Sequence, residues 1–214
     1  MKVIEDMVSR PGVWPGNIAN DDIMVSSRVR LARNVRGAFF PHRASPDENV
    51  RLLGKLGPDV CALPSMAGAV TMNMAELSWT EKHVLIERHL ISMEQSEKGM
   101  GSGLVLKPDE SVAVMINEED HLRMQALLPG QALDAAWRIV DRLDSELEER
   151  VTCAFSRRYG YLTACPSNVG TGLRASAMMH LPGLNLLNEV EPVVTGLTRI
   201  GFAVRGLMGE GTEA

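Results

Sequence analysis

The sequence predicts an α+β fold with a largely antiparallel sheet flanked by helices. Two observations carry this prediction: short apolar segments are joined by tight turns, and amphipathic helices separate groups of these segments. A third observation is the length of 214 residues, which suffices for one sizeable core. No internal repeat or shift in composition marks a boundary, so we expect residues 1–214 to form a single domain.

Turn residues and helix-start signals define the first half of the chain. Pro, Gly, Asn and Asp are concentrated at 11–22 and predict a loop, after which 23–33 predicts a strand. Two capping boxes, Ser-Pro-Asp-Glu and Ser-Trp-Thr-Glu, predict helices over 45–57 and 78–91. The glycines at 99–103 predict a further loop.

The second half alternates strands with two helices. The apolar segment 111–116 predicts a buried strand, and apolar residues spaced three and four apart over 131–150 predict an amphipathic helix. The remaining expectations, in order, are a strand at 161–165, a turn at 166–172, a strand at 173–181, a helix at 184–200, a strand at 202–205 and a loop at 206–214.

Composition excludes several classes of protein. Hydrophobic residues make up 45% and charged residues 23%, values of an ordinary globular protein rather than a disordered chain. The net charge of −5 disfavours a protein that coats nucleic acid. The odd count of three cysteines favours a reducing compartment, and we find neither an export signal in 1–16 nor an apolar stretch of membrane-spanning length. We therefore expect a cytoplasmic protein that contacts no membrane.

Five dispersed arginines are the first candidate site. Each is at or beside the end of a predicted strand, and Arg28 and Arg30, being two apart, point to one face of theirs. The guanidinium fork suits phosphate binding, so converging arginines would hold a polyphosphate without a P-loop, whose motif is absent. Separate surface charges paired with acids are the alternative. The five are Arg28, Arg30, Arg123, Arg174 and Arg205.

Three consecutive acids follow the predicted strand at 111–116, in the segment Asn117-Glu118-Glu119-Asp120-His121. They repel one another unless a cation lies beside them, so either a metal ion or a cationic substrate fits. A solvated strand end is the alternative interpretation.

Cys165 precedes the glycine-containing turn at 166–172, where glycines can bring backbone N–H groups close to a ligand. A β-turn after a structural cysteine is the alternative. His89 lies at the edge of the predicted helix 78–91, and two roles are open for it there: packing and ligand binding. Cys61 and Cys153 lack zinc-ligand spacing and are interpreted as structural.

These segments together resemble the catalytic domain of the phosphagen (guanidino) kinase superfamily, and most closely its bacterial branch of protein-arginine kinases. The likeness runs in order from about residue 20 to the end. It is carried by Val25-Ser-Ser-Arg-Val-Arg-Leu-Ala-Arg-Asn34, Glu87-Arg-His-Leu-Ile-Ser92, Asn117-Glu-Glu-Asp-His-Leu-Arg123, Arg158-Tyr-Gly-Tyr-Leu-Thr-Ala-Cys-Pro-Ser-Asn-Val-Gly-Thr-Gly-Leu-Arg-Ala-Ser176 and Val204-Arg-Gly-Leu-Met-Gly-Glu-Gly-Thr-Glu-Ala214.

The resemblance implies ATP- and Mg²⁺-dependent transfer of the γ-phosphoryl group to arginine side chains of other proteins. It implies that Glu119 and Glu210 handle the guanidinium, with Glu119 as the base, and that Cys165 lies beside the acceptor. The sequence shows no dedicated set of Mg²⁺ ligands, so we expect nucleotide phosphates and water to hold the ion. The family's nucleotide contacts would fall on Ser26, Ser27, Arg28, Val29, Arg30, His89, Arg123, Arg174, Ala175, Ser176, Ala177, Met178, Arg205, Gly206, Leu207, Met208, Gly209 and Glu210.

The chain stops just past Glu210, whereas the family continues through further strands and helices that complete the sheet. We therefore expect a C-terminally truncated catalytic domain, and whether it is active stays open. The missing part would carry a regulatory site and much of a homodimer contact. The resemblance also implies an activator protein and partners among stress regulators and proteases.

Three alternatives to a protein-arginine kinase stay open. One is a small-molecule guanidino kinase that uses free arginine or a relative. The second is a non-catalytic module that binds nucleotide or arginine-containing segments. The third, disfavoured by the net charge and the lack of interleaved aromatic residues, is a nucleic-acid binder using Arg28, Arg30, Arg33 and Arg36.

Overall fold

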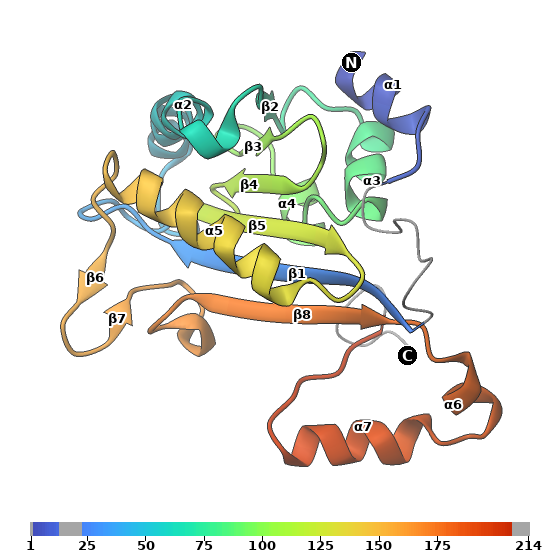
Figure 1. Ribbon diagram of the computed structural model, residues 1–214. Helices are drawn as coiled ribbons and strands as arrows, with labels where there is room; N and C mark the ends of the chain where they lie inside the picture. The colour runs from blue at the N-terminus through green and yellow to red at the C-terminus, as the bar shows by residue number, and fades with distance from the viewer. Residues whose placement is uncertain (1, 13–22, 207–214) are drawn as a thin grey trace.

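The computed structural model describes residues 2–12 and 23–206, and its centre is an antiparallel sheet of order β2-β3-β4-β5-β1-β8 (Figure 1). The strands are β1 (Met24–Arg33), β2 (Val70–Asn73), β3 (Gly103–Leu106), β4 (Val112–Ile116), β5 (Leu122–Pro129) and β8 (Leu173–Met179), with a separate ribbon of β6 (Phe155–Ser156) and β7 (Gly160–Tyr161). This arrangement confirms the predicted α+β class.

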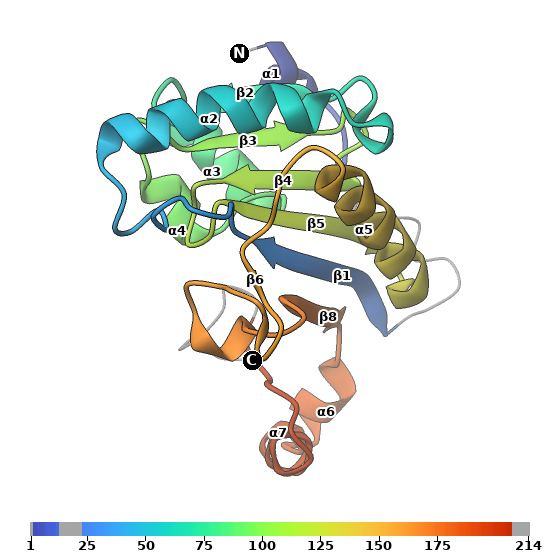
Figure 2. The same ribbon diagram turned by 90° about the vertical axis from the view of Figure 1, so that its left-hand side faces the viewer.

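Helices cover the two faces of the sheet unequally (Figure 2). The helices are α1 (Lys2–Val8), α2 (Pro46–Cys61), α3 (Trp79–Glu87), α4 (Met93–Glu97), α5 (Leu133–Glu148), α6 (Pro182–Leu186) and α7 (Val190–Arg199), with 3₁₀ turns at Pro64–Met66 and Pro166–Asn168. Among the described residues, no helix is both long and apolar enough to cross a bilayer.

One face carries the main core. Val29 and Leu31 of β1 pack with α2 and with the stripe of α5 that includes Val140 and Leu143. That stripe confirms the amphipathic helix predicted over 131–150, since burying such a face drives most helix formation in proteins. This layer fixes which side chains of β1 point inward.

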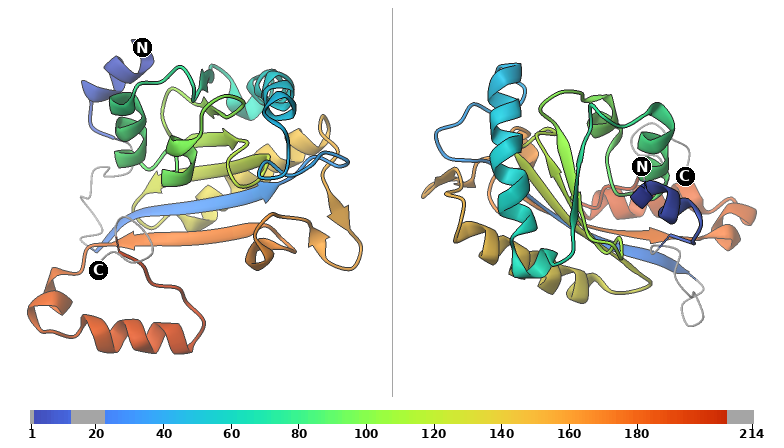
Figure 3. Two further views of the ribbon diagram at one scale, coloured as in Figure 1. Left: turned by 180° about the vertical axis from the view of Figure 1, so that it is seen from behind. Right: turned by 90° about the horizontal axis from the view of Figure 1, so that it is seen from above.

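The opposite face is covered along only half its width. A second cluster, including Met7 of α1, Leu85 of α3 and Met115 of β4, covers the sheet near β3 and β4. Over β5, β1 and β8 the same face carries polar side chains, and α6 and α7 lie beyond β8 (Figure 3). This uncovered half is where the candidate site lies.

Both predicted capping boxes are confirmed, but the far ends of their helices differ from expectation. Ser45 and Ser78 each accept a hydrogen bond from the N3 backbone N–H, and each N3 glutamate bonds back. The first helix continues past Gly57 and Pro58 to Cys61, because burial of Leu56 and Val60 outweighs the hydrogen bond that proline cannot donate. The second ends at Glu87, since the left-handed His89 (φ 57°) turns the chain.

Three other predictions were wrong. The expected strand at 161–165 pairs only at Tyr161, because Ala164 donates its N–H to the Asp120 carboxylate instead of to a neighbouring strand. The helix expected at 184–200 breaks into α6 and α7 at Asn188, whose φ is 57°. Residues 202–205 form no strand. Strands β2, β3 and β5 were not predicted. The loops expected at 11–22 and 206–214 lie mostly outside the described residues.

Candidate active site

Strand register gathers the arginines on the uncovered face of the sheet. Arg28 and Arg30 project from β1 to the same side, because alternate residues of a strand share a face. Arg174 of β8 pairs directly with Arg30, and Ser176 pairs with Arg28. The Cβ atoms of directly opposite residues lie roughly 5 Å apart, so the side chains of Arg30 and Arg174 leave the sheet next to each other.

Arg123 joins this group from the other side. It stands on β5 opposite Ala32, which places it diagonally from Arg30 on the same face. Burial, followed by repulsion from Arg123 and Arg174, lowers the pKa of Arg28. Burial and then repulsion from Arg28, Arg123 and Arg174 lower the pKa of Arg30 to about 9. Arg30 therefore stays protonated at pH 7, and the mutual repulsion of these arginines marks a potential that favours an anion.

Three of these arginines have no acidic partner in the described part of the chain. Within residues 2–12 and 23–206, no carboxylate lies at ion-pair distance from Arg28, Arg30 or Arg174. Like charges placed opposite each other without counter-charges destabilise a sheet, so their presence indicates a site for a bound anion.

His89 borders the arginine face. The side-chain amide of Gln125, which is opposite Arg30 on β5, donates to the carbonyls of His89 (2.8 Å) and Leu90 (3.2 Å). Burial and then the nearby Arg28 lower the pKa of His89, so the neutral imidazole is favoured. Gln125 was not singled out in the sequence, and only its position opposite Arg30 distinguishes it from any other glutamine.

The acidic segment divides into residues with different surroundings. The Glu118 side chain is 1% exposed; its Oε1 accepts from Arg123 Nη1 at 2.6 Å and from the Ser92 hydroxyl. The Glu119 side chain is 42% exposed, and its Oε2 is 3.2 Å from Arg123 Nη2. Burial raises the pKa of Glu119, against the opposing effect of Arg123. Glu119 is thus the accessible acid and Glu118 the buried one.

Asp120 connects this acidic loop to the loop of Cys165. Its Oδ1 accepts from Asn34 Nδ2 (2.6 Å) and from the backbone N–H of Ala164 (2.7 Å). Glu119 and Cys165 are each one residue away from this contact. The Cys165 Sγ lies 3.0 Å from the Ser167 hydroxyl.

The glycines of the turn at 166–172 have structural roles. The N–H groups of Gly170 and Gly172 donate to Tyr161 and Asn168, so they are not free for a ligand as the sequence suggested. Gly172 has a φ of 66°, and a Cβ there would lie 2.6 Å from the carbonyl oxygen of Ala32. This glycine allows the turn to pack against the end of β1.

Several residues expected to contact nucleotide do not face the arginines. Ser27 and Val29 lie on the opposite face, where Ser27 bonds to the Gly130 carbonyl and Val29 is in the core. The pleat also turns Ala175 and Ala177 to that side, whereas Ser26, Ser176 and Met178 share the side of Arg28.

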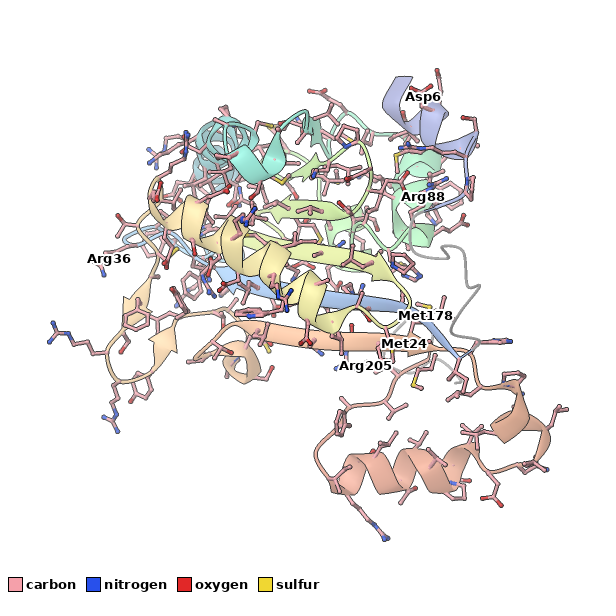
Figure 4. The ribbon with its side chains drawn as sticks, viewed as in Figure 1. Asp6, Met24, Arg36, Arg88, Met178 and Arg205 are labelled. Carbon is pink, nitrogen blue, oxygen red and sulfur yellow. The ribbon has the colours of Figure 1, made fainter. Side chains whose placement is uncertain are left out.

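The C-terminal candidates are only partly described. Figure 4 shows Arg205 on the segment that returns from α7 toward β8. Gly206 is the last described residue, and Leu207, Met208, Gly209 and Glu210 lie outside the described residues.

Arg33 belongs to a different part of the fold from Arg28 and Arg30. Its Nη2 is 2.6 Å from Asp144 Oδ2, and its guanidinium lies 3.5 Å from the centre of the Tyr161 ring. Because this arginine is buried and paired, Arg33 does not share a surface with Arg28, Arg30 and Arg36, as the nucleic-acid alternative assumed.

The thiols and acids give no sign of a protein-bound metal in the described part of the chain. No group of three histidines, cysteines or carboxylates there is arranged to hold a metal ion. Cys61, Cys153 and Cys165 are all free, and burial raises the pKa of Cys153 to about 11, which makes it a poor nucleophile.

Comparison with known families and proteins identifies a family for this chain. Residues 64–214 match the family described as ATP:guanido phosphotransferase, C-terminal catalytic domain. A protein-arginine kinase of Moorella thermoacetica is 48% identical over 97% of this chain, and one of Halothermothrix orenii is 45% identical over 90%. The chain covers 60% and 55% of those two proteins, so it spans little more than half the length of these relatives.

Solved structures share the fold. The duplicated taurocyamine kinase of Schistosoma mansoni, with bound components of a transition-state analogue, superimposes with a TM-score of 0.79 at 25% identity, covering 90% of this chain and 28% of that one. A lombricine kinase superimposes with a TM-score of 0.73 at 22% identity, covering 96% of this chain and 59% of that one.

Proposed function

Because the chain belongs to the ATP:guanido phosphotransferase family, we propose that it transfers the γ-phosphoryl group of ATP to arginine side chains of proteins. One observation supports this most. Arg28, Arg30 and Arg174 share one face of the sheet and have no acidic partners among the described residues, and the accessible carboxylate of Glu119 lies nearby, in contact with Arg123 of the same face. This arrangement provides an anion site adjoining a site for a cation.

The arginine face matches the electrostatic demands of the reaction. Phosphoryl transfer passes through a loose transition state whose charge is spread over the phosphoryl oxygens, so neutralisation and in-line positioning matter most. Arg28, Arg30 and Arg174 would bind the triphosphate, and His89 would lie beside the base. Mg²⁺ would be held mainly by phosphate oxygens and water, and would supply further charge neutralisation when bound.

Glu119 would handle the acceptor. A guanidinium is protonated and a poor nucleophile, so one carboxylate must orient it and take a proton as a nitrogen attacks. The new bond joins that nitrogen to the γ-phosphorus, the bond from the γ-phosphorus to the β–γ bridging oxygen breaks, and ADP leaves with that electron pair. The raised pKa of Glu119 makes its carboxylate a better proton acceptor. Glu210 and Cys165 are proposed as its neighbours at the acceptor.

Protein arginine is the proposed acceptor because relatives carrying the name protein-arginine kinase are 38–48% identical to this chain. The partial exposure of Glu119 is compatible with a large substrate. We also propose that residues 1–214 form one catalytic domain, and that the protein works in the cytoplasm, which fits three free cysteines.

The test is phosphoryl transfer from ATP with Mg²⁺ to an arginine-rich protein and, separately, to free arginine. We expect phosphoarginine in the protein, and its loss in Glu119→Gln with nucleotide affinity retained. The matched control is Glu94→Gln, a nearby exposed acid, which should keep full transfer. Modification of free arginine alone would establish the small-molecule alternative, and transfer by Glu119→Gln would remove Glu119 from its role.

A further inference from the structure

We propose that Arg123 occupies the acceptor carboxylate in the absence of nucleotide, as an internal substitute for the acceptor guanidinium, and that triphosphate binding draws it off Glu119. This inference rests on the proposed function and concerns how its two substrates influence each other. It predicts that nucleotide binding, besides occupying the nucleotide site, frees the Glu119 carboxylate to bind the acceptor.

The first support is chemical identity. The group bound to Glu119 Oε2 is a guanidinium nitrogen, Arg123 Nη2, at 3.2 Å. An acceptor arginine would offer the same group to the same carboxylate, and a carboxylate oxygen engaged by one guanidinium is less available to a second. Arg123 and the acceptor are therefore competitors for Glu119.

The second support is that the two terminal nitrogens of the Arg123 guanidinium make contacts of unequal strength. Its Nη1 is 2.6 Å from Oε1 of Glu118, which is 1% exposed and also accepts from Ser92. The contact with Glu119 is longer and partly exposed to water, so it is weak and easily exchanged. Glu118 further accepts the backbone N–H of Glu119 at 2.9 Å, which keeps the loop in place while the Arg123 side chain moves. Glu118 is thus a positioning residue: it holds one nitrogen of Arg123 and the backbone of Glu119 while the other nitrogen of Arg123 exchanges partners.

The third support is that Arg123 lies within reach of the anion site. It is diagonal to Arg30 across the β1–β5 pair, which corresponds to roughly 7–8 Å between such positions. Its charge already contributes to lowering the pKa of both Arg28 and Arg30. A triphosphate at those arginines reverses the local potential from repelling Arg123 to attracting it.

The consequence is reciprocal coupling. If nucleotide draws Arg123 away from Glu119, it raises acceptor affinity, and by thermodynamic linkage the acceptor raises nucleotide affinity by the same factor. Arg123 would then help neutralise the triphosphate while Glu119 is free to orient the acceptor.

Calorimetric titrations with two probes distinguish a failure of this inference from a failure of the proposed function. The probes are a non-hydrolysable ATP analogue with Mg²⁺ and a short arginine peptide with blocked termini. For the unaltered chain, we expect the analogue to tighten peptide binding roughly tenfold. In Arg123→Gln, peptide binding without nucleotide should become tighter than in the unaltered chain, nucleotide binding should weaken, and the coupling factor should fall to about one.

Two further variants make the result decisive. Arg174→Gln removes an arginine of the same face that does not contact Glu119, so it should weaken nucleotide binding and leave nucleotide-free peptide binding unchanged. Arg123→Lys keeps a cation beside the buried Glu118 but cannot bridge both acids, so it should show the same loss of coupling and decides the matter if Arg123→Gln does not fold.

The inference is overturned if both probes bind while the Arg123 variants retain full coupling and unaltered peptide affinity. Failure of the unaltered chain to bind either probe would instead contradict the proposed function.

Discussion

Arg30 of β1 and Arg174 of β8 stand directly opposite each other in the antiparallel sheet, with no acid of the described residues at ion-pair distance from either. Such a pair raises the free energy of the ligand-free protein, because like charges directly opposite on neighbouring strands repel. Binding of a polyanion would remove the repulsion. The pair therefore links the stability of the sheet to occupation of the site.

Replacing Arg174 by methionine should separate stability from binding. We expect the free energy of unfolding in urea to rise by about 0.5 kcal/mol, since the repulsion disappears. Nucleotide affinity should fall by roughly tenfold or more, because a charge-assisted hydrogen bond to phosphate is lost. Urea midpoints and calorimetric titration measure the two effects. A less stable variant with unchanged affinity would show that Arg174 has a packing role instead.

The buried pair between Arg33 and Asp144 should be costly to break from one side. Arg33→Met leaves the Asp144 carboxylate buried without its partner, and we expect a loss of about 3–5 kcal/mol in the free energy of unfolding. The double variant Arg33→Met/Asp144→Leu should recover much of this loss, because no unpaired charge remains. The exposed Arg142 lies on α5, the helix that carries Asp144, and provides the control Arg142→Met, which should change stability little. Equal losses in the single and double variants would contradict this account.

Gly172 should not tolerate a side chain. Its φ is 66°, and an added Cβ would lie 2.6 Å from the Ala32 carbonyl oxygen. We expect Gly172→Ala to destabilise the protein by about 1–3 kcal/mol in urea unfolding. Gly183→Ala, in α6 with nothing within 4 Å of its added Cβ, is the matched control and should be neutral or slightly stabilising. Similar stability of the two variants would contradict the close approach at Gly172.

His121 should make the protein less stable as pH falls from 7 to 5. Its Nδ1 accepts the N–H of Val35 (3.1 Å) and its Nε2 bonds to the Phe39 carbonyl (3.0 Å), which requires the neutral ring protonated on Nε2. Burial lowers the pKa of His121, so the unfolded chain takes up a proton before the folded one does. The stability contributed by the neutral ring is therefore complete above the unfolded pKa and is lost as pH falls through the folded pKa.

Urea unfolding at several pH values measures this effect as a difference between variants. His121→Gln should show a smaller loss of stability between pH 7 and pH 5 than the unaltered chain, because glutamine does not titrate. His180→Gln replaces an exposed histidine and should keep the original pH dependence. Identical slopes for all three proteins would remove His121 as the source.

Local chemistry made part of the fold predictable. The reciprocal Ser45–Glu48 hydrogen bonds depend only on residues three apart, so the helix start was readable from the sequence. Strand β5 was missed because Met, Gln, Ala and Leu carry no strand preference; it forms a strand because β1 and β4 pair with it on both edges and most of its residues are buried. The break at Asn188 likewise depends on backbone conformation that composition does not reveal.

The same distinction applies to the candidate site. The sequence by itself determined that Arg28 and Arg30 share a face and that acids follow strand β4, since both depend on neighbours along the chain. Only the tertiary structure decided that Arg174 stands opposite Arg30, and that Glu118 is buried while Glu119 is accessible. The physical reason is that strand register and burial arise from contacts between segments far apart in sequence, and these set the charge and solvent exposure that give identical residue types different roles.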